Sequence, residues 1–172
     1  MSKQQPTATE SLIAAYNRML ERVQELMEDA EDKAIPTLEE GIKNARNKAV
    51  ELGEITAEEA EKIGGWIKRD MEEASLYLAS GGREFANWLK FDIEQVEKHV
   101  LDVLLSVADR TKLELEAFER SIEANNIYRA GEITGAGVLV CKDCGEQMHF
   151  YETSTIPACA KCKGTKFKRP RQ

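Results

Sequence analysis

Apolar side chains recur every three or four residues through most of the first 124 positions, which predicts a chain built mainly from helices. The first run extends from Thr9 to about Lys33, and Pro36 ends it because proline lacks the backbone donor that a helix needs. A second run begins at Leu38 and stops at Gly53. One face of the first helix would carry Leu12, Tyr16, Leu20, Val23, Met27 and Ala30.

The third run begins at Thr56-x-x-Glu59, which has the spacing of a capping box. Gly64-Gly65 lies inside this run and weakens the prediction of a helix there. Gly81-Gly82 marks the next turn, and a fourth run follows over residues 83–124, either as one helix or with a break near residues 109–111. Helices joined by short turns pack antiparallel, so we expect a helical bundle or antiparallel coiled coil.

The pattern changes near Asn125, beyond which glycines and turn residues replace the helical period. Three short stretches have the composition of strands, namely Val138–Val140, Met148–Tyr151 and Lys166–Lys168. The chain is therefore predicted to be mainly α, followed by a small unit of short antiparallel strands.

All four cysteines lie in this β unit, in two Cys-x-x-Cys pairs separated by fourteen residues. Two thiolates on one tight turn can bind the same ion, about 2.3 Å from each sulfur. Gly145 and Lys163-Gly164 follow the two pairs, and a positive φ there would fold the backbone into a knuckle. A redox dithiol is the alternative interpretation, but two matched pairs favour metal. Four sulfurs leave no position for a substrate, so the prediction is one structural Zn²⁺ bound by Cys141, Cys144, Cys159 and Cys162.

Three parts follow from these patterns. Residues 1–8 are a polar, disordered lead-in, residues 9–124 form an acidic helical bundle or coiled coil, and residues 125–172 form a zinc ribbon with a basic tail. The formal charge of -7 is uneven, because residues 125–172 carry eight Lys/Arg and four Asp/Glu, a net +4, which leaves -11 on the remainder. An acidic body with a basic end is typical of a protein that binds partners.

The basic end alternates cations with an aromatic residue. Lysine and arginine hold a phosphate backbone, and an aromatic ring stacks on a base. A solubilising tail with no ligand is the alternative, and four thiolates with one zinc add a formal -2 that weakens the patch. The candidate nucleic-acid contacts are Lys166, Phe167, Lys168, Arg169 and Arg171.

Nothing in the sequence predicts catalysis, so we expect no enzyme. A phosphate-binding glycine loop is missing, His99 and His149 are isolated, and the cysteines are all used by the metal. Residues 1–10 lack the apolar core of a secretory signal, and the longest apolar stretch, residues 100–108, is too short to span a bilayer. We expect a cytoplasmic protein with no membrane association, where thiols stay reduced.

Several segments carry a resemblance that covers nearly the whole chain. Residues 128–141, the knuckles CKDCG and CAKC, and the closing Phe167-Lys168-Arg169 resemble an uncharacterised bacterial family of zinc ribbon-containing proteins, the YbeL-like family. Residues 53–56, Lys68-Arg69-Asp70 and residues 108–111 are also similar to it. The resemblance implies zinc at the four cysteines and a helical N-terminal region, and it implies no activity.

Two functional hypotheses follow. The first is a non-enzymatic, zinc-stabilised interaction protein whose ribbon contacts nucleic acid or a nucleic-acid machine such as RNA polymerase or the ribosome. The second is a protein–protein adaptor or oligomeric scaffold with a purely structural zinc. In both, the helical part binds a protein partner or a second copy of the chain. Salt dependence separates them, because phosphate contacts weaken steeply as salt rises.

Overall fold

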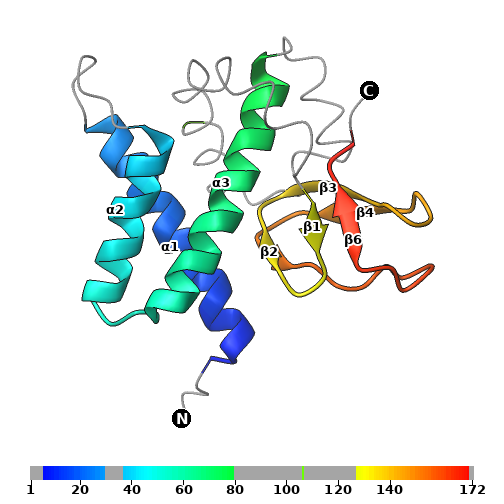
Figure 1. Cartoon of the computed structure of the whole chain (residues 1–172), viewed down its shortest axis with the longest axis horizontal. Helices are drawn as coiled ribbons and strands as arrows, with labels where there is room; N and C mark the ends of the chain where they lie inside the picture. Colours follow the sequence, from blue (N-terminus) through cyan, green and yellow to red (C-terminus); the bar gives the residue numbers. More distant parts are fainter. Residues whose placement is uncertain (1–5, 30–36, 80–105, 107–126, 171–172) are drawn as a thin grey trace.

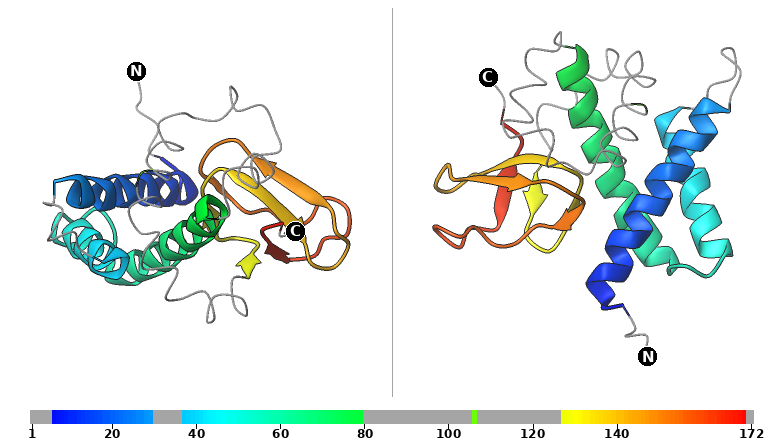
Figure 2. Two further views of the ribbon diagram at one scale, coloured as in Figure 1. Left: turned by 90° about the horizontal axis from the view of Figure 1, so that it is seen from above. Right: turned by 180° about the vertical axis from the view of Figure 1, so that it is seen from behind.

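Three helices stand beside a small β unit in the computed structural model, which describes residues 6–29, 37–79, 106 and 127–170 (Figure 1). The helices are α1 (Ala8–Glu28), α2 (Leu38–Glu51) and α3 (Ala57–Ala79). Each helix contacts the other two, and the β unit lies against the side of α3 (Figures 1 and 2). The prediction of a helical part followed by short antiparallel strands is confirmed.

All three helices begin with the same capping box, in which a threonine and a glutamate satisfy each other's backbone donors. The boxes are Thr7–Glu10, Thr37–Glu40 and Thr56–Glu59. In the third, the threonine N–H donates to the glutamate Oε2 at 2.8 Å and the threonine Oγ1 accepts from the glutamate N–H at 3.2 Å. Only this third box was predicted, and Ala8 at the end of the expected lead-in is already helical.

The apolar faces of the helices meet in one core, as the periodicity predicted. The glycine pair in α3 does not interrupt that helix. A Cβ on Gly64 would lie 2.7 Å from Arg46 Cδ and 3.1 Å from Ile42 Cγ2, so this glycine lets α2 and α3 approach closely, whereas Gly65 faces open space. The buried core comprises Ala15, Tyr16, Met19, Leu20, Val23, Met27, Leu38, Ile42, Ala45, Ala49, Ile63, Ile67, Met71 and, from the β unit, Ile133.

The β unit holds a four-stranded antiparallel sheet and a two-stranded one. Three of its strands confirm the prediction in type, with bounds Gly137–Cys141 (β3), Gln147–Phe150 (β4) and Lys166–Lys168 (β6). Three two-residue strands were missed because two residues are too few to show a period. They are β1 (Tyr128–Arg129), β2 (Ile133–Thr134) and β5 (Ser154–Thr155).

Strand order places the metal-binding turns next to the sheet. The larger sheet has the order β1-β6-β3-β4, and the smaller pairs β2 with β5. Cys141 is the Cα partner of Phe167, which is in turn the partner of Tyr128. Partners across an antiparallel pair share a face, so these three side chains all enter the interior of the β unit.

Some expectations fall outside the described residues. These are the fourth helical run over residues 83–124 and its continuity, the domain boundary near Asn125, and Arg171. Within the described part of the chain, none of the helices is long and apolar enough to cross a membrane.

Candidate metal centre

Two turns with the same backbone pattern carry the four cysteines. In the first, Cys141 N–H donates to Glu146 O at 2.8 Å, and Gly145 N–H donates back to Cys141 O at 3.0 Å. The second repeats both bonds at the same spacing, from Cys159 N–H to Gly164 O at 2.9 Å and from Lys163 N–H to Cys159 O at 2.9 Å. The two knuckles are therefore related by a local pseudo-symmetry that points all four thiols toward one position.

The four sulfurs fit a single zinc ion. All of the Sγ atoms lie within 4.8 Å of one another, with Cys141 to Cys162 at 3.5 Å and Cys144 to Cys159 at 3.6 Å. A tetrahedral site with Zn–S bonds of about 2.3 Å requires sulfurs roughly 3.8 Å apart. Four cysteine thiolates are also the donor set that structural zinc prefers, so the predicted ligands are brought together in a suitable geometry.

The residues that close the knuckles have different tasks. Gly145 has φ 76° and Lys163 has φ 63°, so the positive φ expected after each pair is present in both knuckles. In the second knuckle a lysine adopts it, and the neighbouring Gly164 serves another need. A Cβ on Gly164 would lie 3.1 Å from both Cys141 Sγ and Cys162 Sγ, so any side chain at this position would crowd the sulfurs.

Backbone donors prepare at least one thiol for metal. The backbone N–H groups of Cys162 and Lys161 lower the pKa of Cys159 to about 7, against the opposing effect of burial. A lowered pKa favours the thiolate form that zinc binding requires. Gly164 N–H also donates to Cys162 Sγ at 3.4 Å and lowers the pKa of this thiol, but the neighbouring thiols and burial outweigh it and raise the pKa to about 12.

Sequence comparison agrees with this geometry. Residues 25–171 match the zinc-ribbon containing domain, which covers most of the chain. The chain belongs to this zinc-ribbon family. It is 24% identical over 128 residues to the uncharacterised protein YbeL of Escherichia coli strain K12, covering 74% of this chain and 79% of the relative. YbeL of strain O157:H7 matches equally well, and no solved structure matches the chain. Together with the cysteine cluster, the family supports zinc as the metal.

The predicted nucleic-acid contacts do not share one surface. Phe167 and Arg169 are buried, at 0% and 2% exposure, so neither side chain reaches an external base or phosphate, and both are withdrawn as contacts. Lys166 and Lys168 alternate with them on β6 and are exposed. Arg129, which the sequence pattern did not single out, is exposed on β1 as the Cα partner of Lys166.

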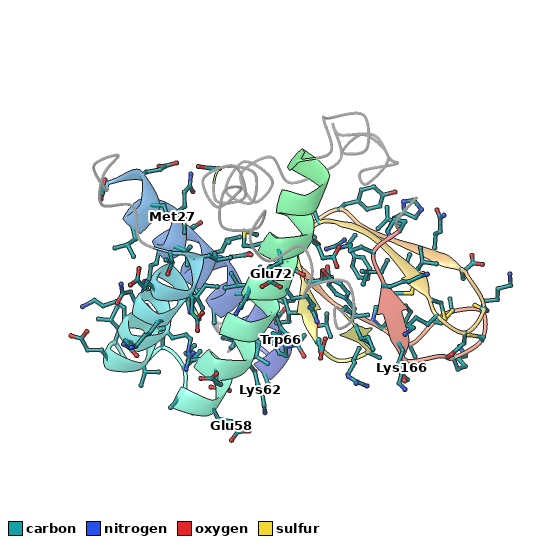
Figure 3. All side chains as sticks on the ribbon, turned by 45° about the horizontal axis from the view of Figure 1, so that its top comes forward. Met27, Glu58, Lys62, Trp66, Glu72 and Lys166 are labelled. Atoms are coloured by element: carbon teal, nitrogen blue, oxygen red, sulfur yellow. The ribbon has the colours of Figure 1, made fainter. Side chains whose placement is uncertain are left out.

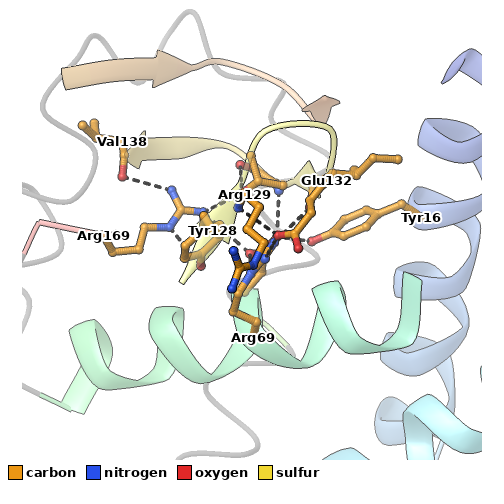
Figure 4. Close-up of polar contacts among 11 residues, drawn as sticks. Tyr16, Arg69, Tyr128, Arg129, Glu132, Val138 and Arg169 are labelled. Carbon is orange, nitrogen blue, oxygen red and sulfur yellow. Dashed lines mark hydrogen bonds and ion pairs between the residues drawn. The ribbon is translucent and has the colours of Figure 1, made fainter. Parts of the chain in front are cut away.

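A buried polar cluster between the ribbon and α3 was also missed. We call it the junction network (Figure 4). At its centre Asp70, 2% exposed, accepts hydrogen bonds through Oδ2 from Tyr16 Oη at 2.6 Å and from Gly135 N–H at 2.8 Å. The network consists of Tyr16, Arg69, Asp70, Tyr128, Glu132, Thr134 and Arg169.

Two arginines reach this network from opposite sides. Arg169, after β6, donates to Thr134 Oγ1 at 3.0 Å and to Tyr128 Oη and Val138 O at 3.3 Å each. Arg69, on α3, pairs with Glu132, donates to the Ile133 carbonyl at 3.1 Å and lies 3.8 Å from the centre of the Tyr128 ring. Both buried guanidinium groups therefore lie near one carboxylate oxygen, Asp70 Oδ1, which is 3.5 Å from Arg69 and 4.0 Å from Arg169.

The two arginines of the network keep their charge inside the protein, because the pKa of each is raised. Burial alone lowers the pKa of Arg69, but the charge of Asp70 together with Tyr128 and Glu132 outweighs burial, so the pKa is raised overall. Burial raises the pKa of Tyr16 well above its usual value, and the Asp70 charge acts in the same direction. The Tyr16 hydroxyl therefore keeps its proton and donates it in the hydrogen bond to Asp70.

Proposed function

We propose that this protein is a non-enzymatic cytoplasmic interaction protein that holds one structural zinc ion and contacts the phosphate backbone of a nucleic acid through its ribbon. Four thiolates complete the coordination of zinc and leave no position for a reacting molecule. A unit of fewer than about 50 residues buries little surface, so its fold would depend on the ion.

The observation that supports an anionic partner is a row of cations on the outer face of the larger sheet. We call Arg129, Lys142, Lys166 and Lys168 the outer basic row. Three of them share this face through strand register, because Arg129 is the partner of Lys166 and Lys168 is two residues further along β6. Lys142 follows β3 and is fixed by its N–H, which donates to Lys166 O at 2.9 Å.

The row supports phosphate contacts in preference to base stacking. All four side chains are exposed, and none forms an ion pair within the described part of the chain. Phe167, the aromatic residue expected to stack on a base, is buried on the opposite face. Cations without an aromatic platform hold the backbone with little regard to sequence, as expected for a structured nucleic acid or a ribonucleoprotein surface.

The decisive experiment combines charge removal with a salt titration. Arg129→Gln, Lys166→Gln and Lys168→Gln together remove three cations without touching a ligand or the junction network. Lys43→Gln, Lys48→Gln and Lys62→Gln remove three from exposed helix positions as the matched control. The first variant should bind duplex DNA or structured RNA more weakly, with a salt slope reduced by about 0.9 for each duplex phosphate that the protein no longer neutralises.

A protein–protein adaptor is the competing function. The helical part, which carries most of the acidic residues, would then bind a protein partner or a second copy of the chain, and the outer basic row would have no specific ligand. Absence of nucleic-acid binding by the wild-type protein at low salt, where charge attraction is strongest, would exclude direct contact and favour the adaptor. Elemental analysis of protein purified without chelator should find one zinc per chain in either case.

A further inference from the structure

The junction network joins the metal-binding unit to the helices through one carboxylate. Asp70 is held on one side by Tyr16 of α1 and on the other by the backbone of Gly135 in the ribbon. Asp70 Oδ1 lies 4.0 Å from Arg169 and 3.5 Å from Arg69 of its own helix, and this oxygen accepts no hydrogen bond within the described part of the chain. The ribbon thus supplies both a donor and a cation to a carboxylate that belongs to a helix.

Arg169 is connected to the metal site through a short, regular piece of backbone. The second knuckle ends at Gly164, β6 begins two residues later at Lys166, and Arg169 is the next residue after β6. β6 is paired with β3, whose last residue is the metal ligand Cys141, opposite Phe167. Both ends of this strand pair are therefore anchored, one by the sulfurs and the other by the buried guanidinium.

Two further contacts dock the ribbon on the same helices. Ile133 of β2, 1% exposed, packs into the helical core. Thr153, before β5, donates to Asn17 Oδ1 of α1 at 2.7 Å. β2 and β5 pair with each other, so the smaller sheet is one part of the ribbon that touches α1 and α3.

We propose that zinc occupancy controls the docking of the ribbon on the helices, with Arg169 and Asp70 as the latch that links the two. Bound zinc fixes both knuckles and with them the β3–β6 register, which holds Arg169 at Asp70. Loss of zinc releases that register, because too few apolar contacts remain in the ribbon to hold it. Asp70 then loses the Gly135 donor and the Arg169 cation and keeps only Arg69 of its own helix beside Oδ1. Loss of two partners of a buried carboxylate disfavours the docked state.

The latch makes a prediction for the full-length protein before and after zinc removal by a chelator. Amide hydrogen exchange should rise at least tenfold near Tyr16 in α1 and near Asp70 in α3, whereas α2, which supplies no residue to the junction network, should change little. Unchanged exchange at both sites in metal-free protein would overturn the proposal, because the ribbon would then stay docked without zinc.

Coupling must also act in the opposite direction. If zinc favours docking, weakening the latch from the helix side must weaken zinc binding by the same factor. Asp70→Asn keeps an acceptor for Tyr16 and Gly135 but removes the charge that faces Arg169. Its zinc affinity, measured by competition with a chromophoric chelator, should fall by about 5- to 150-fold, the usual range for coupled sites.

Two further variants keep this test decisive. Glu58→Gln, an exposed carboxylate of the same helix paired with Lys62, should leave zinc affinity unchanged (Figure 3). Arg69→Gln removes a helix-side contact with the ribbon, the pair with Glu132 and the bond to Ile133 O, so it should also lower zinc affinity and serves where Asp70→Asn does not fold. Wild-type zinc affinity in folded Asp70→Asn, or in Arg69→Gln if it replaces it, would show that ribbon and helices are independent.

Discussion

Gly164 offers the sharpest test of the metal geometry, because its backbone passes directly beside two of the four sulfurs. In Gly164→Ala the new Cβ would lie 3.1 Å from Cys141 Sγ and Cys162 Sγ, and closer still to Asp143 Oδ2. Asp143 is exposed, so its carboxylate can rotate away at little cost. The two sulfurs cannot, because a bound zinc fixes each of them about 2.3 Å away.

The size of the effect follows from this difference. Inserting a methyl group into a packed site costs about 1–3 kcal/mol when the neighbours cannot move. Since about 1.4 kcal/mol corresponds to a factor of ten in affinity, the zinc affinity of Gly164→Ala should fall by about 5- to 150-fold. Metal-free protein should lose less stability, because its sulfurs are free to adjust.

Gly145→Ala is the matched control. It places the same methyl group in the other knuckle, where nothing lies within 4 Å of the new Cβ, but where φ is 76°. It should cost about 1–2 kcal/mol of backbone strain. That strain belongs to the knuckle itself, so it should appear in the metal-free ribbon as well, if the turn persists there. Competition with a chromophoric chelator measures both variants, and a zinc affinity of Gly164→Ala equal to wild type would refute the geometry.

Three more changes test other parts of the structure. Lys163→Gly relieves a left-handed lysine, so it should stabilise the zinc-loaded protein by about 1 kcal/mol in chemical unfolding, and a decrease in stability would contradict the assigned φ of 63°. Gly65→Ala, in open space, should raise the free energy of unfolding by up to about 1 kcal/mol. Gly64→Ala should be less stable than Gly65→Ala, because its new Cβ meets side chains of α2. Burial raises the pKa of Tyr16 and of Tyr128, so each keeps its proton when folded and releases it when unfolded above about pH 10. The free energy of unfolding should therefore be unaffected by these two groups below that pH and fall by about 1.4 kcal/mol per pH unit for each above it, and Tyr16→Phe should halve their share.

Local chemistry explains how much of the fold the sequence could predict. Apolar side chains at helical spacing, and a threonine followed by a glutamate three residues later, act within one turn, so the three helices and the start of α3 follow from them. The cysteine spacing has the same local character, because two ligands on one turn must bind one ion. Gly64 shows the limit, since its purpose is a neighbour on α2 that no local pattern reveals.

The junction network could not be predicted for a physical reason. A helix with Lys68-Arg69-Asp70 has the appearance of a solvated face, and a strand that alternates lysine, phenylalanine and arginine has the appearance of a binding tail. Arg69, Asp70 and Arg169 are buried only because distant parts of the chain meet. Two of the contacts in the network, Arg69 with Glu132 and Asp70 with Gly135, join residues more than 60 positions apart in the sequence. The available signal was that the segments carrying the family resemblance included these residues.

The uneven charge of the two parts of the chain must also be counted without the buried ion pairs before it indicates a partner. Arg169, one of the cations counted for the ribbon, is buried inside the protein beside Asp70 of α3. In turn Arg69, a cation of α3, pairs with Glu132 of the ribbon. These pairs hold the two parts of the chain together and leave nothing for a ligand. What remains available is the outer basic row, where the register of β1 and β6 sets the spacing of the cations. The case for an anionic partner therefore depends on the few exposed cations of one sheet face, and their removal is the change that distinguishes a nucleic-acid-binding protein from an adaptor.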